Sequence, residues 1–160
     1  MAKLNLLEPG TEAPYFEALD QNEKLVKLTD FKGKKLVLYF YPKDMTPGCT
    51  VEAKNLRDNY EILKKAGLEV VGVSTDNVES HKKFAAKHDL PFSLLADTDK
   101  KIVKDYGVWG KKKMFGKEYE GTHRITYIID EEGKIVDVIK KVKTKEHAQQ
   151  ILDRLQKLNK

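Results

Sequence analysis

Hydrophobic runs alternate along this chain with stretches whose apolar residues recur at helical spacing. The continuous apolar run Leu36–Tyr41 and the largely apolar segment Leu68–Val73 are typical of buried strands. Shorter apolar runs predict further strands at Leu25–Leu28, Phe92–Leu95, Ile125–Ile129 and Ile135–Ile139. The last two are joined by a short acidic segment that ends in glycine, which predicts a hairpin.

The helices are predicted from the polar stretches between these strands. After a loop at Pro42–Gly48, apolar residues at helical spacing predict a helix that runs through Leu63 and ends at Gly67. Further helices are predicted at Val78–His88, at Asp99–Tyr106 and from Thr144 onward, the last with an apolar face of Ala148, Ile151, Leu152, Leu155 and Leu158. The stretch Gly107–Thr122 is rich in glycine and lysine and is predicted to be a loop.

The order of these elements, β-β-α-β-α-β-α-β-β-α, predicts an α/β fold. A parallel core followed by an antiparallel hairpin and a final helix gives a mixed central sheet with helices on both faces, which is the plan of thioredoxin-like folds. The 160 residues match the size of about one domain, so we expect residues 1–160 to form a single domain. A chain of this length buries enough surface for a hydrophobic core.

The pattern of charge argues against nucleic-acid binding. The chain has 30 basic and 25 acidic residues, a net charge of +5, and only three arginines: Arg57, Arg124 and Arg154. Nucleic-acid sites usually rely on arginine for bidentate contacts, whereas the lysines here are spread along the chain. We therefore expect a solvated lysine-rich surface, including Lys111–Lys113. No apolar run approaches the ~20 residues that span a bilayer, so we expect no membrane segment.

Cys49 is the single cysteine of the sequence. One cysteine excludes an internal disulfide, a Cys₄ or Cys₂His₂ zinc site and a Cys-x-x-Cys redox pair. The N-terminal residues also lack the apolar core and the small-residue cleavage site of a secretory signal. Together these features predict a cytoplasmic protein.

The residues around Cys49 place it at the start of a helix. Pro47 suits the first helical position and Thr46 the N-cap, so Cys49 falls in the first turn. The positive end of the helix dipole favours a thiolate there, at the carboxyl end of a buried strand where α/β proteins place their sites. A buried structural cysteine is the alternative. Gly48 and the lack of large apolar neighbours favour an exposed helix start.

The spacing Pro42-x-x-x-Thr46-x-x-Cys49 resembles the active-site signature of the peroxiredoxins. The longer string YPKDMTPGCTVEA, followed by NLRD, looks like the PrxQ subfamily, also called bacterioferritin comigratory protein. Collinear blocks continue this resemblance over nearly the whole chain: VVGVST, FSLLAD, YGVWG and GTHRITYIID. The chain is therefore similar to this subfamily well beyond the signature itself.

The resemblance implies a thioredoxin-like fold and a thiol peroxidase that needs no metal, haem or flavin. Cys49 would be the peroxidatic nucleophile, which becomes a sulfenic acid. Pro42 would shield the thiolate from water, and the Thr46 hydroxyl would bond both the sulfur and the peroxide. Arg124 would hold the thiolate and stabilise charge on the leaving oxygen. Glu52, one helical turn after Cys49, would orient this arginine.

The sequence departs from the subfamily at its resolving cysteine. Many PrxQ proteins carry that cysteine five residues after the first, where this chain has Lys54, and others carry it on the next helix, where it has Ala85. The resemblance therefore implies a one-cysteine peroxiredoxin. We expect a monomer that is recycled by an external thiol such as thioredoxin, or glutaredoxin with glutathione.

Two other interpretations of Cys49 stay open on the sequence. A cysteine–histidine transferase would use His123, next to Arg124, as its base. A holdase or interaction module would keep the fold and leave the thiol vestigial. Three histidines lie in polar helical stretches and are expected to be exposed: His81, His88 and His147. No spacing of histidines, cysteine and carboxylates predicts a metal site.

Overall fold

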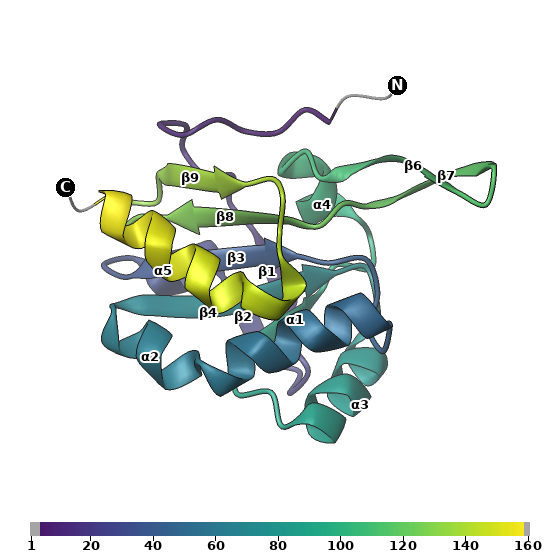
Figure 1. Cartoon of the computed structure of the whole chain (residues 1–160), viewed down its shortest axis with the longest axis horizontal. Coiled ribbons are helices and arrows are strands. Elements are labelled where there is room, and N and C mark those ends of the chain that lie inside the picture. Colours follow the sequence, from purple (N-terminus) through teal and green to yellow (C-terminus); the bar gives the residue numbers. More distant parts are fainter. Residues whose placement is uncertain (1–3, 159–160) are drawn as a thin grey trace.

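The computed structural model describes residues 4–158 and is built on a five-stranded sheet in the order β5-β4-β3-β8-β9 (Figure 1). The three parallel strands are β3 (Lys35–Phe40), β4 (Leu68–Ser74) and β5 (Ser93–Ala96). Next to β3, antiparallel to it, lies β8 (Ile125–Ile129), which pairs in turn with β9 (Ile135–Ile139). The predicted mixed sheet is thus confirmed, and the two strands that end the sheet form the predicted hairpin.

Helices cover both faces of this sheet. Four of them contribute side chains to the core on one face: α1 (Pro47–Asp58), α2 (Tyr60–Lys65), α3 (Val78–His88) and α5 (His147–Leu158). The opposite core is closed by α4 (Lys101–Asp105), the N-terminal segment and a small hairpin of β1 (Glu17–Leu19) and β2 (Leu25–Lys27). Two 3₁₀ turns complete the described elements, η1 (Leu28–Phe31) and η2 (Thr144–Glu146).

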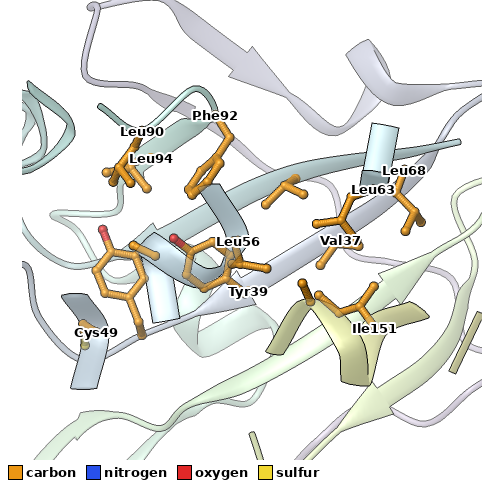
Figure 2. Close-up of a cluster of buried hydrophobic side chains, with 14 of the residues drawn as sticks. Val37, Tyr39, Cys49, Leu56, Leu63, Leu68, Leu90, Phe92, Leu94 and Ile151 are labelled. Atoms are coloured by element: carbon orange, nitrogen blue, oxygen red, sulfur yellow. The ribbon is translucent and has the colours of Figure 1, made fainter. Parts of the chain in front are cut away.

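The continuous apolar run of β3 follows from these two cores. Val37 and Tyr39 face the first core, whereas Leu36, Leu38 and Phe40 face the second. A central strand alternates its side chains between two buried faces, so every position has to be apolar. Figure 2 shows the first core, in which Val37, Leu63 and Leu68 lie at one end and Cys49 lies at the other.

The prediction of a loop at Gly107–Thr122 is wrong. This segment forms a hairpin that projects from the body of the molecule, made of β6 (Trp109–Met114) and β7 (Lys117–Thr122) (Figure 1). Phe115 and Gly116 at its turn both have positive φ, as two-residue hairpin turns require. Its register places Lys111 opposite Glu120 and Lys113 opposite Glu118, and opposite charges at facing positions favour pairing of the two strands.

Other differences from the predicted elements are small. The predicted helix that follows the Cys49 loop is divided at Asn59 into α1 and α2, and β1 was not predicted because its sequence, EAL, is not an apolar run. Thr144 begins a 3₁₀ turn, and the α-helix proper begins at His147. Among the helices of residues 4–158, none combines the length and the apolar character that crossing a bilayer requires.

Candidate active site

The loop between β3 and α1 delivers Cys49 to the edge of the first core. Pro47 occupies the first helical position, as expected, and Thr46 has the extended backbone of an N-cap. Its side chain does not cap the helix within the described part of the chain, because the Thr46 hydroxyl donates to the carbonyl of Lys43 at 2.8 Å. Thr46 is thus the N-cap residue, as predicted, but within residues 4–158 it lacks the side-chain hydrogen bond that usually accompanies this position. The hydroxyl turns back into the loop, where its oxygen can still accept a hydrogen bond.

Cys49 is the third residue of α1, and its side chain is only 2% exposed. The expectation of an exposed position is wrong, because the sulfur packs into the first core (Figure 2). Glycine at position 48 leaves room for Arg124 beside the sulfur. A Cβ added to Gly48 would lie 3.2 Å from an Nη2 atom of Arg124. The glycine thus lets the guanidinium approach the helix start.

Arg124 joins Cys49 to Glu52. Its Nη2 donates to the Cys49 Sγ at 3.3 Å, and its Nη1 donates to the Glu52 Oε1 at 2.6 Å. Burial works against the guanidinium charge, but the carboxylate and the thiolate outweigh it and raise the pKa of Arg124. The residue just before β8 therefore presents a fixed cation to the sulfur, and the carboxylate of Glu52 orients that cation.

Glu52 is fully buried, and burial raises the pKa of its carboxyl to about 7 against the opposing charge of Arg124. Its second oxygen, Oε2, accepts no hydrogen bond from residues 4–158. That oxygen lies 3.5 Å from the Nε2 of His147. One oxygen of Glu52 is thus hydrogen-bonded to Arg124, whereas the other has no hydrogen-bond donor among the described residues.

His147 is also fully buried, so its expected exposure is wrong. Its Nε2 lies 2.8 Å from the Thr126 Oγ1, and its Nδ1 lies 3.2 Å from the Gln150 Oε1. Burial lowers the pKa of His147 to about 4, so the imidazole is neutral at neutral pH. The sequence alone gives no sign of this contact, because His147 begins a polar helix 95 positions after Glu52 along the chain.

Lys112 belongs to the site as well, although the sequence predicts a solvated run of lysines. Its ammonium is half-buried and donates to the carbonyl of Thr122 at 2.8 Å. Burial and the charge of Arg124 lower the pKa of Lys112, whereas the charge of Cys49 raises it. The β6–β7 hairpin therefore brings a second cation near the sulfur.

The other predicted residues take less central places. Pro42 is partly exposed in the loop that leads to α1. The His123 Nε2 lies 3.1 Å from the carbonyl of Lys111, so the ring is engaged by the hairpin and not by the sulfur. Lys54 is exposed on α1 and Ala85 is buried on α3. Hence the structure brings Cys49, Arg124 and Glu52 together.

Comparisons with known proteins agree with this geometry. Residues 9–138 match the model of the AhpC/TSA family, and the chain therefore belongs to that family. Peroxiredoxin Bcp of Escherichia coli (strain K12) is 49% identical over 150 residues, which cover 94% of this chain and 96% of the relative. Peroxiredoxin Bcp of Bacillus subtilis (strain 168) is 46% identical and covers 96% and 98% of the two chains.

Solved structures give the same result. Xanthomonas campestris peroxiredoxin Q matches with a TM-score of 0.86 and 34% identity, and the match covers 98% of this chain and 99% of that one. A cysteine-to-serine variant of PrxQ from Xylella fastidiosa matches with a TM-score of 0.87 and 29% identity over the full length of both chains. The fold is thus the thioredoxin-like fold of peroxiredoxins. Within the family the chain is of the Bcp/PrxQ type, a thiol-dependent peroxidase with a single cysteine.

Proposed function

We propose that this chain reduces hydrogen peroxide and organic hydroperoxides at Cys49 and is recycled by an external thiol. The observation that carries the proposal is the 3.3 Å contact between the Arg124 Nη2 and the Cys49 Sγ. A guanidinium in that position stabilises the thiolate and the charge that develops on the peroxide. Xanthomonas campestris bacterioferritin comigratory protein, similar to this chain with a TM-score of 0.85, has been described for its alkyl peroxide reduction activity.

The chemical step is a displacement at oxygen. The Cys49 thiolate attacks the hydroxyl oxygen of the peroxide, a sulfur–oxygen bond forms, and the oxygen–oxygen bond breaks. The departing alkoxide, or hydroxide from hydrogen peroxide, takes up a proton and leaves as an alcohol or as water. Cys49 is oxidised to the sulfenic acid and the peroxide is reduced. Arg124 stabilises the negative charge as it moves from sulfur to the departing oxygen.

We assign the remaining predicted residues to supporting roles. Thr46 donates its hydroxyl hydrogen to Lys43, so toward the peroxide it acts as an acceptor. Pro42 limits access of water to the thiolate. Glu52 fixes the orientation of Arg124 through the 2.6 Å hydrogen bond.

The sulfenic acid is resolved by a thiol from outside the chain, because the sequence has no second cysteine. A first thiol displaces water from the sulfenic acid and forms a mixed disulfide, and a second thiol releases Cys49. Thioredoxin and glutaredoxin with glutathione supply such thiols in a reducing cytoplasm, where we place this protein. We further propose that it acts as a monomer and as one domain.

Intact-mass spectrometry tests this function. After one equivalent of peroxide, the wild-type chain should gain one oxygen, and added thiol should remove it. The matched control is Cys49→Ser, which should gain nothing. An unmodified wild-type thiol would overturn the peroxidase proposal. Protection of client proteins by Cys49→Ser, or acyl transfer that depends on His123, would support one of the two other interpretations.

A further inference from the structure

Asp44 is a charged residue in the Cys49 loop whose side chain is almost fully buried. It lies two residues before Thr46 and is only 4% exposed. A buried carboxylate is costly unless every oxygen has a partner, so its surroundings are informative. The peroxide chemistry proposed above does not use Asp44.

The partners of Asp44 come from its own loop, from α3 and from the segment between β4 and α3. Its Oδ1 accepts from the Tyr41 hydroxyl at 2.6 Å, and its Oδ2 accepts from the Ser80 hydroxyl at 2.7 Å. The same Oδ2 lies 2.7 Å from the Nδ1 of His81, which is fully buried, contrary to its expected exposure. The backbone amide of Asp44 donates to the Asp76 Oδ2 at 2.8 Å. The loop is thereby fastened to the segment after β4 and to α3.

Geometry also fixes the proton of this pair. The His81 Nε2 lies 2.8 Å from the carbonyl oxygen of Leu95, which only accepts, so Nε2 carries a hydrogen. The Nδ1 faces a carboxylate oxygen at 2.7 Å, so one further proton lies between His81 and Asp44. Both ring nitrogens are thus committed, and the ring joins the loop to β5.

Asp44, Asp76 and His81 come close enough together to suggest a metal site, since one ligand atom from each lies within 4.8 Å of the others. The bonding of Asp44 argues against that interpretation. Both of its oxygens already accept hydrogen bonds from the protein, and the His81 Nδ1 is occupied by one of them. The cluster is therefore closed on itself as a hydrogen-bonded anchor.

The residue after Asp44 shows why the loop needs an anchor. Met45 has a φ of +67°, a left-handed conformation that costs a residue other than glycine of order 1 kcal/mol or more. Its side chain is 44% exposed, so packing of that side chain contributes little to holding the turn. The strained turn leads directly into Thr46 and the start of α1.

We propose that the Asp44–His81 pair is a positioning device for the peroxide reaction. It holds the strained loop so that the start of α1 presents Cys49 to Arg124 and Thr46 to the peroxide. The inference deepens the proposed function and rests on it. The pair touches neither the sulfur nor the peroxide, so it acts entirely through the loop.

The test compares variants that keep different halves of the His81 contact. His81→Gln keeps an amide near the Leu95 carbonyl and loses the donor to Asp44, whereas His81→Asn keeps a donor at the Nδ1 position. We expect His81→Gln and Asp44→Asn to lower the rate of Cys49 oxidation by peroxide about 10- to 100-fold, because small displacements of reacting groups cost rates of that order. His81→Asn should recover part of the loss.

Asp20→Asn is the matched control. Asp20 is also buried and accepts hydrogen bonds from Asn22, Lys24 and Ser93, but it lies in the turn between β1 and β2. This variant should lose thermal stability and keep the wild-type oxidation rate. If Asp20→Asn slows oxidation as much as Asp44→Asn at an equal loss of Tm, the pair has only a structural role and the proposal is wrong.

Two further measurements keep the test decisive. Should the His81 and Asp44 variants not fold, Tyr41→Phe removes a single donor to Asp44, and a wild-type oxidation rate in that variant would overturn the proposal. Should the wild-type chain not reduce peroxide at all, the proposed function fails by itself. Alkylation of Cys49 by iodoacetamide then probes the position of the loop without peroxide. Equal alkylation rates in wild type and His81→Gln would show that His81 does not position the loop.

Discussion

Two buried acid–histidine pairs lie on either side of the start of α1, and they are bonded very differently. In the pair before the helix, Asp44 and His81 are 2.7 Å apart and both carboxylate oxygens accept hydrogen bonds. In the second pair, Glu52 lies within α1 and His147 begins α5, and their facing atoms are 3.5 Å apart. There the facing oxygen of Glu52 has no donor among residues 4–158.

The difference comes from which ring nitrogen carries the hydrogen. Gln150 has its amide oriented by a bond from its Nε2 to the carbonyl of Lys141, so its Oε1 faces the Nδ1 of His147 and accepts from it. The Nε2 of the neutral ring is then an acceptor, which takes the hydroxyl hydrogen of Thr126. Two acceptors therefore face each other at Glu52, whereas a proton lies between His81 and Asp44. The first pair is closed, and the second is free to take up a proton.

Arg124→Lys should have the largest effect, because Arg124 is the one residue among 4–158 that is hydrogen-bonded both to the sulfur and to Glu52 of the second pair. Lysine keeps the charge but cannot reach Cys49 and Glu52 at once with a planar fork. We expect kcat/KM for peroxide to fall about 10²- to 10³-fold, the usual loss for one donor that acts in the transition state. Steady-state kinetics with a thiol reductant measure this. Wild-type kinetics in the variant would show that Glu52 and His147 do not influence the reaction through Arg124.

The second prediction concerns how the free energy of unfolding depends on pH in wild type and in Glu52→Gln. Burial raises the pKa of Glu52 from 4.5 to about 7, so its contribution to stability is full below pH 4.5 and is lost as pH rises through 7. Burial lowers the pKa of His147 from 6.5 to about 4, so its contribution is full above pH 6.5 and is lost as pH falls through 4. Between pH 4.5 and 6.5 these opposite slopes offset each other.

Without Glu52, the dependence of stability on pH between pH 4.5 and 6.5 should therefore show the contribution of His147 alone. Relative to wild type, the free energy of unfolding of Glu52→Gln should rise by about 1.4 kcal/mol per pH unit across that interval. Denaturant unfolding at several pH values gives the comparison. The control is Gln149→Ala, an exposed and uncharged position on α5, which should not produce this slope. Parallel curves for wild type and Glu52→Gln would show that Glu52 is ionised throughout.

A smaller effect is expected for His147→Gln, which gives Glu52 the donor it lacks. An amide N–H near the Nε2 position can donate to the Glu52 Oε2 and favour the carboxylate, which lowers the pKa of Glu52. The peroxide rate of wild type should fall below about pH 7, where Glu52 takes a proton and releases Arg124. In the variant this fall should move to lower pH. Gln149→Ala, on the exposed side of α5, is the control and should not move it.

Ser80→Ala should have the smallest effect, because it removes one of three donors from the closed pair. We expect the free energy of unfolding to fall by about 1 kcal/mol, as for a typical hydrogen bond. The oxidation rate should fall less than in His81→Gln, since His81 still holds Asp44. Thermal unfolding and stopped-flow oxidation measure the two quantities. A loss as large as that of His81→Gln would mean that Ser80, and not the histidine, holds the loop.

The sequence predicts the sheet and the helix start well, because both depend on local patterns. The run Leu36–Tyr41 is apolar at every position, and Pro47 marks the first turn of α1. Neither buried histidine could be found in this way. His81 and His147 lie in polar helices, and each is buried only because another segment brings a carboxylate to it. Such long-range partners leave no periodic signal in the sequence.

The site shows the same division. Cys49, Thr46 and Pro42 come from one short signature, and its spacing places them around one loop. Lys112 was missed because the hairpin that carries it has no apolar alternation. The pattern of hydrophobic residues therefore predicts neither its strands nor their register. The half-buried position of the Lys112 ammonium follows from the pairing of β6 with β7, which brings it to the carbonyl of Thr122.

The tethering of α1 bears on where a resolving thiol can come from. Lys54 follows Cys49 by five residues in the same helix, about 7.5 Å along its axis, whereas a disulfide needs Cα atoms within about 7 Å. The helix is anchored at Asp44, and Asn55 bonds it to the backbone of Lys145. In a Lys54→Cys chain, the helix would have to unwind before the two sulfurs could react. The free energy of that unwinding would lower the effective concentration of the second thiol at Cys49. A freely diffusing thiol at modest concentration would then compete with one that is always covalently nearby.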